Sequence, residues 1–161
     1  DPETPYPSAY QDSQGHTLFA DYRELEDRGD VLSFTGAPFT EDTEVTGYVN
    51  CRLFASTDCV DTDFVCRVAD ISEDGTMLPL LSGLVRGKTR MGYDIRLLNP
   101  GEVYEFEIRL GAISNLFRKG HRIRVDLTSS LYPAHNRNLN TADRIGYGTE
   151  ARIAHQTIYT G

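Results

Sequence analysis

The residues best suited to chemistry lie in the stretch GHRIRVDLTSSLYPAHNRNLNT at 120–141, which places two serines near a histidine. A serine hydrolase needs its nucleophile on a sharp turn, with a histidine base and an acid nearby. Ser129 and Ser130 end a predicted strand close to His135, but the sequence has no G-x-S-x-G motif. Serines at strand ends more often hydrogen-bond the backbone, and His121 is interpreted in the same way, as a hydrogen-bonding turn residue. The sequence therefore predicts no catalytic residue.

Carboxylates gather in a second stretch, the loop DCVDTD at 58–63. Spaced carboxylates such as Asp58, Asp61 and Asp63 can hold Ca²⁺, but the loop lacks the glycine and the closing glutamate of an EF-hand. We expect these side chains to bond backbone N–H groups and an arginine instead. No metal site and no cofactor are predicted.

Arg137 is the candidate partner for these carboxylates, because it stands in a polar loop that follows a predicted core strand. An arginine fork can satisfy a carboxylate and several carbonyl groups at once. We predict that Arg137 folds back on the end of the sandwich and pairs with Asp61 or Asp63, with Asn138 in the same structural polar loop. The alternative is that Arg137 points outward as a docking residue.

The elements that must position these groups are expected to be strands separated by turns. Ile123, Val125 and Leu127 alternate with charged residues, which is the two-residue period of a half-buried strand. Two short segments, 21–30 and 112–117, are expected as helical turns. No long helix and no repeat is apparent, so the sequence predicts an antiparallel sandwich. Strands are expected at 31–34, 45–56, 64–71, 77–90, 104–110, 122–129 and 151–159.

Composition limits the class of protein. A chain of 161 residues fits a single domain. It is 39% apolar, with no apolar run near the about 20 residues of a membrane span. Net charge is −8 and the basic residues are scattered singly, whereas a nucleic-acid binder gathers them into a patch. We expect neither nucleic acid nor a membrane as a partner.

Three cysteines show no metal-ligand spacing with the four histidines. The pattern favours free thiols in a reducing compartment, and hence a cytoplasmic location. Cys51 and Cys66 are expected to be buried, and Cys59 to be the most reactive because it lies in a turn. A disulfide between Cys51 and Cys66 is the alternative, since both residues should point inward from neighbouring strands.

The stretch at 120–141, together with an ordered set of shorter motifs, resembles the C-terminal domain of the Xaa-Pro dipeptidyl-peptidase and cocaine-esterase family of serine hydrolases. Each short motif is weak alone, but their common order along the chain is specific. The opening DPETPYPS looks like the segment that leads from the catalytic domain of that family into this one. The other motifs are DVLSF (30–34), TEDTEVTG (40–47), DTDF (61–64), SEDG (72–75), PGEVYEFEI (100–108) and AHQTIYTG (154–161).

The resemblance implies a jelly-roll β-sandwich of the galactose-binding-like kind, with two antiparallel sheets over 30–161. It implies that this domain is attached to an α/β-hydrolase catalytic domain that holds the Ser-Asp-His triad, none of which lies in this chain. Segment 1–29 would be a linker and pocket-wall loop, with Tyr10, His16 and Phe19 as the wall of the substrate pocket. The family usually has one more strand, which leaves open whether a final strand is missing.

Two functions follow from this sequence. The first is an accessory domain of a serine ester or peptide hydrolase, which packs on the catalytic domain, helps to shape its pocket and is not catalytic alone. The second is a carbohydrate-binding module, because the jelly-roll fold often binds sugars. Sugar platforms use exposed aromatic residues, and Trp is absent, so Tyr10, Tyr22, Tyr48 and Tyr93 would have to serve.

Overall fold

The computed structural model describes residues 1–5, 10–11, 17–18 and 28–160. Its strands form two antiparallel layers, as the all-β prediction requires. One layer is a four-stranded sheet in the order β3-β8-β5-β6. Its strands are β3 (Leu32–Thr35), β8 (Arg122–Thr128), β5 (Asp63–Ile71) and β6 (Met77–Arg86).

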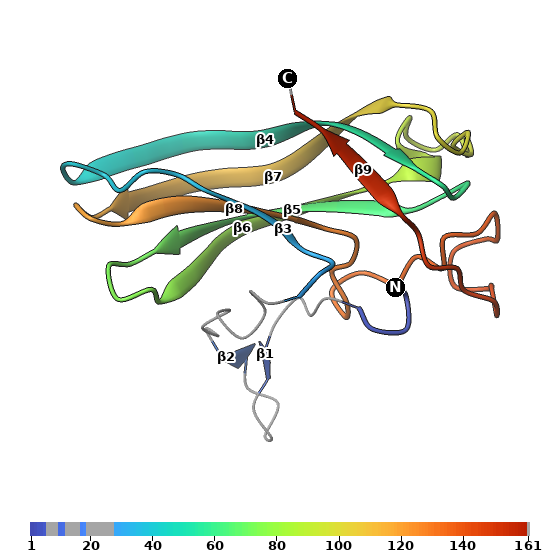
Figure 1. The fold of residues 1–161 in the computed structure, drawn as a ribbon, viewed down its shortest axis with the longest axis horizontal. Coiled ribbons are helices and arrows are strands. Elements are labelled where there is room, and N and C mark those ends of the chain that lie inside the picture. Colours follow the sequence, from blue (N-terminus) through green and yellow to red (C-terminus); the bar gives the residue numbers. More distant parts are fainter. Residues whose placement is uncertain (6–9, 12–16, 19–27, 161) are drawn as a thin grey trace.

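The second layer is a three-stranded sheet in the order β7-β4-β9. It contains two long strands and a short one: β4 (Thr43–Thr57), β7 (Tyr104–Phe117) and β9 (Gln156–Tyr159). In Figure 1 this layer lies above the four-stranded sheet, with the strands of the two layers roughly aligned. Such an aligned packing of antiparallel sheets is a β-sandwich. The finer jelly-roll topology stays a prediction.

The prediction of a helical turn at 112–117 is wrong, because β7 continues as a strand to Phe117. Its register against β4 shifts where Val49 pairs with Gly111 and Asn50 pairs with Arg109. The extra residue in β7 is a β-bulge, and it moves the inward-facing positions from even-numbered to odd-numbered residues. The bulge thus interrupts the alternation in the sequence without ending the strand.

The core lies between the two sheets. Its fully buried members come from β4, β5 and β7, with Leu98 from the loop after β6. Gly83 of β6 permits the sheets to approach closely, because a Cβ there would lie 2.5 Å from the carbonyl oxygen of Arg109. Close approach of another backbone is one of the known reasons for a glycine inside a strand. The cluster contains Leu53, Ala55, Phe64, Cys66, Leu98, Phe106, Ile108 and Leu110.

The middle of the four-stranded sheet is buried on both faces. The face of β8 that carries Arg124 and Asp126 was expected to be its polar side, yet both residues are buried. Arg124 donates through Nε to Asp126 at 2.7 Å, and Ser33 of the neighbouring strand β3 donates to the same carboxylate at 2.7 Å. Pairing within the sheet is what makes this burial tolerable for charged groups.

The loops at one end of the sandwich gather around the N-terminus. Figure 1 shows the first residues next to the loops that connect β8 to β9, with the loop that follows β6 at the same end. A short 3-10 turn, η2 (Gly87–Thr89), begins the latter loop. Two more strands of two residues each, β1 (Tyr10–Gln11) and β2 (Thr17–Leu18), pair with each other. The expected helical turn at 21–30 falls mainly outside the described residues.

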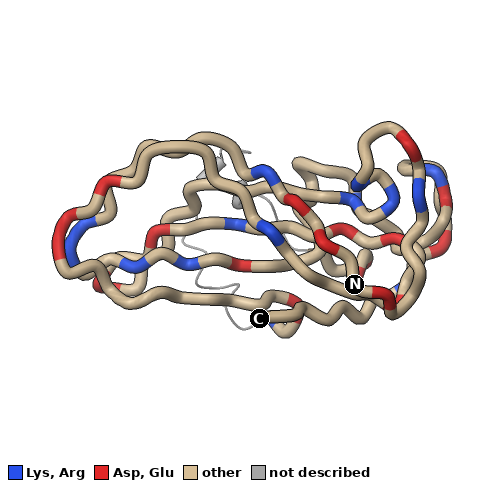
Figure 2. Tube along the Cα trace, turned by 90° about the horizontal axis from the view of Figure 1, so that it is seen from above, with Lys and Arg blue, Asp and Glu red and all other residues tan. Residues whose placement is uncertain are grey.

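Charged residues are distributed over the whole fold. Figure 2 shows basic and acidic positions interspersed along the described trace, at both ends and along the strands. No helix in the described part of the chain is long and apolar enough to cross a membrane.

Candidate functional site: a buried charge network and an adjoining pocket

Asp61 and Asp63 meet Asn138 at the loop-rich end of the sandwich. The two aspartates are 0% and 1% exposed. The amide nitrogen of Asn138 donates to Asp61 Oδ2 at 2.9 Å and to Asp63 Oδ1 at 2.7 Å. Its amide oxygen accepts the backbone N–H of Asn140 at 2.9 Å. One asparagine therefore joins the loop before β5 to the loop after β8.

Two cations neutralise the buried carboxylates. Arg86, at the end of β6, donates through Nε and Nη2 to the two oxygens of Asp63, each at 2.7 Å. The ammonium group of Lys88 lies 3.0 Å from Asp61. Burial raises the pKa of Asp63, while Arg86 and Asn138 oppose that rise. The Asp63 carboxylate in turn raises the pKa of Arg86.

The same two cations hold the β8–β9 connection in place. Arg86 donates to the backbone oxygen of Asn136 at 2.8 Å, and Lys88 donates to that of Asp143 at 2.7 Å. Asn140, with φ of 60°, donates its amide to the backbone oxygen of Arg152 at 2.6 Å. Every polar group of this network is thus used in structural bonds. The network therefore has a structural role, which is to hold the loops together, and not the role of an acid or base in a reaction.

The prediction that Arg137 pairs with Asp61 or Asp63 is wrong. Its Nη1 donates to the backbone oxygen of Pro2 at 2.9 Å, and its guanidinium lies 5.8 Å from the ring centre of Tyr132. Arg86 occupies the position beside Asp63 that we expected for Arg137, because Arg86 is directly opposite Asp63 in the β5–β6 ladder. The sequence does contain Arg86 within the predicted strand 77–90, but its choice as the partner of Asp63 requires the register between the two strands.

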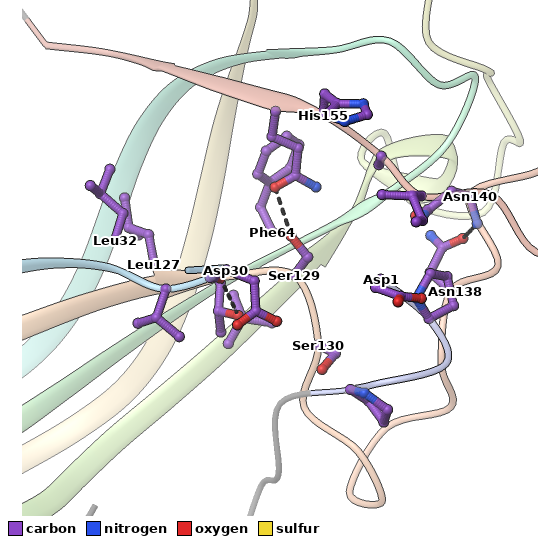
Figure 3. A pocket seen from close by; sticks show the side chains of 18 of the residues that line it. Asp1, Asp30, Leu32, Phe64, Leu127, Ser129, Ser130, Asn138, Asn140 and His155 are labelled. Carbon is purple, nitrogen blue, oxygen red and sulfur yellow. Dashed lines mark hydrogen bonds between the residues drawn. The ribbon is translucent and has the colours of Figure 1, made fainter. Parts of the chain in front are cut away.

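A pocket of about 650 Å³ opens beside this network, between the first residues, the ends of β3, β5 and β8, and the segment that leads into β9. Figure 3 shows Leu32, Leu127 and Phe64 on its apolar side, with polar groups at the opposite wall. Ser129 donates to the side-chain oxygen of Gln156 at 2.7 Å, and Gln156 donates to Thr62 at 2.6 Å. The pocket can therefore accept an apolar group beside hydrogen-bonding side chains.

Ser129 was expected to hydrogen-bond the backbone, but its hydroxyl donates to the side chain of Gln156 instead. The hydrogen-bond partner of Ser129 is thus Gln156 and not His135, and among the described residues no cluster of His, Cys, Asp or Glu is arranged to hold a metal ion. At the opposite end of the sandwich, His121 lies 2.9 Å from Asp70 through Nδ1, as a hydrogen-bonding residue beside a turn.

An Asp–His pair that sequence reasoning missed lies at the rim of the pocket. Asp58 accepts the backbone N–H of His155 at 2.8 Å and lies 3.0 Å from the His155 ring. These bonds lower the pKa of Asp58 from 3.8 to about 2. The neighbouring Cys59 points toward Asp58, not toward the histidine, and burial together with that carboxylate raises its pKa. Asp58 and His155 therefore lack the activated nucleophile that a catalytic triad needs.

The cysteine predictions are partly wrong. Cys59 was expected to be the most reactive thiol, but it is completely buried and its pKa is raised. Cys66 is buried as expected, whereas Cys51 is partly exposed. All three cysteines are free thiols in this structure, so the alternative of a disulfide between Cys51 and Cys66 is not what the structure contains.

Comparison with known proteins identifies the family. Residues 2–161 match the family described as the X-Pro dipeptidyl-peptidase C-terminal non-catalytic domain. Cocaine esterase of Rhodococcus sp. (strain MB1 Bresler) is 42% identical over 153 residues, which cover 88% of this chain and 25% of that protein. The chain belongs to the X-Pro dipeptidyl-peptidase C-terminal domain family. The resemblance seen in the sequence motifs is thereby confirmed.

Solved structures extend this agreement to the fold of the family. An aminopeptidase from the marine sediment archaeon Thaumarchaeota archaeon superposes with a TM-score of 0.89 at 30% identity, over 99% of this chain and 30% of that one. An alpha-amino acid ester hydrolase superposes with a TM-score of 0.87 at 26% identity, over 99% of this chain and 29% of that one. In each case the domain of this family is a fraction of a longer hydrolase chain.

The residues predicted as a substrate-pocket wall are not tested by these observations. His16 and Phe19 lie outside the described residues. Tyr10 is in β1, where its backbone pairs with Leu18 of β2. Of the tyrosines considered for sugar binding, Tyr48 and Tyr93 are exposed but stand on different elements, β4 and the loop after η2.

Exposed apolar side chains mark the two loops that the charge network holds. The loop after η2 exposes Met91, Tyr93 and Ile95, and the connection between β8 and β9 exposes Tyr147 and Ile153. Lys88 and Asp143 join the bases of these loops, as described above. The clamp of buried charges therefore holds the two loops that carry these side chains, and Figure 1 shows both loops at the end of the sandwich near the N-terminus.

Proposed function

We propose that this chain is the C-terminal accessory domain of an α/β-hydrolase-type serine hydrolase, an acyl esterase or an Xaa-Pro dipeptidyl-peptidase-like enzyme. It packs on the catalytic domain of the same protein and is not catalytic alone. Membership of a non-catalytic domain family supports this proposal, as do relatives named as an esterase, an aminopeptidase and an ester hydrolase. The hydrogen bonds of Ser129 and of Asp58 also support it, because they occupy these two side chains in structural contacts.

One observation carries the docking part of this proposal: the apolar side chains exposed on the two loops next to the N-terminus. We define this docking end as Met91, Tyr93, Ile95, Tyr147 and Ile153. Groups of exposed apolar side chains commonly mark interaction surfaces. In a protein whose C-terminal domain this is, the chain arrives from the catalytic domain at the N-terminus, and so at the same end of the sandwich. The catalytic domain is therefore the natural cover for these loops.

The first 29 residues are proposed as a linker and pocket-wall loop, followed by the sandwich. Arg137 binds the backbone oxygen of Pro2, and Arg28 donates to the backbone oxygen of Thr4 at 2.7 Å. Arg28 also forms an ion pair with Asp30. Both ends of the segment are thus held at the sandwich. Its residues between these anchors would face the catalytic domain, where Tyr10, His16 and Phe19 would help to wall the substrate pocket.

A cytoplasmic location is part of the proposal. Three free cysteines, two of them buried, support a reducing compartment.

The test uses the full-length parent hydrolase, with its own substrate, and replaces Met91 and Ile95 by Asp. We expect the double variant to lower kcat/KM and the melting temperature of the whole enzyme, because the charges would have to be buried at the domain interface. The matched control is Leu78→Asp with Leu116→Asp, two exposed apolar residues near the opposite end of the sandwich. The isolated chain carrying either pair should melt like its wild type. Equal loss of activity in both double variants would contradict docking through these loops.

The absence of activity in the isolated chain is tested separately. The purified chain is assayed with short-chain nitrophenyl esters and with an aminoacyl-prolyl amide, with and without a serine-directed inhibitor. We expect no turnover. Inhibitor-sensitive turnover that copurifies with the chain would contradict the accessory role.

A further inference from the structure

A small basic pocket lies between the loops that the charge network holds. Its volume is about 20 Å³, and its wall comes from the end of β6, from η2 and from the connection between β8 and β9. Among the described residues that line it, Asp143 carries the single carboxylate. Cationic side chains gathered around one concavity attract an anion. We define the basic pocket by its four cations, Arg86, Lys88, Arg137 and Arg144.

Two of these cations are buried and already neutralised. The side chains of Arg86 and Lys88 are 10% and 5% exposed. They pair with Asp63 and Asp61, as described above, and they also bond backbone oxygens of the β8–β9 connection. Arg86 and Lys88 therefore hold the pocket in shape, and the charge available to a ligand comes from the other two cations.

Arg137 and Arg144 have no such carboxylate partner. Arg137 uses Nη1 for the backbone oxygen of Pro2, and the guanidinium of Arg144 lies 4.9 Å from the ring centre of Tyr147. In the part of the chain that the structure describes, neither guanidinium forms an ion pair. Because a guanidinium carries five N–H donors in a planar fork, each arginine keeps donors for a ligand.

The loop that carries Arg144 is shaped by a turn and two glycines. Tyr147 donates its backbone N–H to the backbone oxygen of Arg144 at 3.0 Å, and Gly146 between them has a φ of 80°. At Gly148 a Cβ would lie 2.9 Å from the carboxylate of Asp143. A larger residue at either glycine would disturb this loop, so the glycines help to hold Arg144 at the pocket.

We propose that the basic pocket binds one carboxylate group between Arg137 and Arg144. The two guanidinium groups donate charge-assisted hydrogen bonds to its oxygens. A volume of about 20 Å³ holds one or two water-sized atoms, which suits the two oxygens of a carboxylate better than the four of a phosphate. Two sources supply this group: a free small acid, or an Asp or Glu side chain of the parent hydrolase. The pocket belongs to the chain alone, so the proposal does not depend on the proposed function.

The first experiment titrates the isolated chain with acetate at pH 7 and constant ionic strength, and follows the arginine side chains by nitrogen-edited NMR. We expect the Nε–H signals of Arg137 and Arg144 to shift together and to saturate. With a Kd of about 20 mM, about 100 mM acetate should raise the melting temperature by roughly 2–4 °C. Binding should weaken as ionic strength rises, because both arginines are exposed to solvent.

Three variants define how the affinity should change. Arg144→Gln removes one ligand without touching the buried network, and the affinity for acetate should fall about tenfold. Asp143→Asn removes a competing negative charge and leaves the backbone oxygen that Lys88 binds, so the affinity should rise. Arg109→Gln is the matched control, because it removes a cation that is 81% exposed and does not line the pocket. Its affinity should equal that of wild type.

The parent hydrolase distinguishes the two sources of the carboxylate. Acetate binding by the wild-type parent that is lost in Arg144→Gln assigns the pocket to a free acid. Failure of the parent to bind acetate, together with a lower melting temperature in Arg144→Gln than in Arg109→Gln, assigns it to an acidic side chain of the parent. A parent that shows neither effect would contradict the proposal, whereas the titration of the isolated chain is independent of any catalytic domain.

Three results in the isolated chain would overturn the proposal. They are the lack of a saturable shift at Arg137 and Arg144, equal affinity in Arg144→Gln and Arg109→Gln, and binding of chloride or phosphate as tight as that of acetate at the same ionic strength. If Arg144→Gln fails to give a cooperative thermal transition, Asp143→Asn decides. An affinity that does not rise in Asp143→Asn would then contradict the assignment of the site.

Discussion

Replacing Arg86 by Ala tests whether the buried charge network holds the end of the sandwich together. The side chains of Arg86 and Asp63 are 10% and 2% exposed, and both oxygens of the carboxylate accept hydrogen bonds from the guanidinium. The variant would leave a buried carboxylate whose remaining amide partner is Asn138. Stranding one member of a buried ion pair costs about 3–5 kcal/mol.

The magnitude can be checked by thermal unfolding of the isolated chain. In a domain of this size each kcal/mol corresponds to about 2–4 °C, so Arg86→Ala should melt roughly 6–20 °C below wild type. The matched control is Arg52→Ala, which breaks an ion pair with Glu105 whose side chains are 69% and 50% exposed. An exposed pair contributes about 0–1 kcal/mol, so the control should melt within a few degrees of wild type.

The pH dependence of the Arg86→Ala variant gives a second readout. Burial already raises the pKa of Asp63, and removal of the guanidinium would raise it further. At lower pH the stranded carboxylate takes up a proton, which removes the buried charge. The difference in melting temperature between wild type and variant should therefore be smaller at pH 5 than at pH 7. Two results would refute the assignment of the network. One is a loss of melting temperature in Arg86→Ala at pH 7 that is no larger than the loss in the Arg52→Ala control. The other is a loss in Arg86→Ala that grows as the pH falls.

Two further predictions concern other parts of the sandwich. Gly83→Ala should destabilise the chain by about 1–3 kcal/mol in denaturant unfolding, because its Cβ would lie 2.5 Å from the Arg109 carbonyl oxygen. Gly36→Ala, where the nearest atom is 3.5 Å away, should have little effect. Asp58 has a folded-state pKa of about 2 against its ordinary 3.8, so it stabilises the fold above pH 4 and loses that contribution as pH falls toward 2. The pair with His155 is exposed, so Asp58→Asn should reduce the loss of stability in acid by only about 0.2–1 kcal/mol. An acid transition that is unchanged in the variant would contradict this prediction.

Local alternation in the sequence was enough to predict most of the strands. The inward positions of β4, such as Leu53 and Ala55, keep one period over their whole run and are buried. The prediction failed for β7 after Leu110, because a bulge changes which residues face inward. In a single sequence, a shift in the inward–outward alternation at a bulge looks the same as the end of a strand. Only the pairing with the partner strand distinguishes the two cases.

The polar network shows the corresponding limit for side chains. The sequence identified the acceptors, Asp61 and Asp63, because carboxylates in a loop that precedes a core strand must find donors once they are buried. The sequence interpretation chose the wrong donor. Arg137 has the right chemistry and lies in a polar loop, but the strand register does not place it opposite Asp63. Antiparallel pairing puts Arg86 directly opposite Asp63, and that relation depends on the length of the β5–β6 hairpin and its bulge between Val68 and Ala69. Composition and spacing within one loop carry no information about such a pairing.

The two charge systems at this end have different consequences for the proposed domain interface. Arg86 and Lys88 form buried bonds that hold the loops in place, so their removal should lower the folding stability of the isolated chain itself. Arg137 instead binds the first residues through Pro2, at the point where the chain would arrive from a catalytic domain. Its loss removes one hydrogen bond and a ring contact, worth about 1–2 kcal/mol together. That cost would fall on the position of the linker more than on the sandwich, which is why folding stability and interdomain geometry can be separated by mutation in this domain.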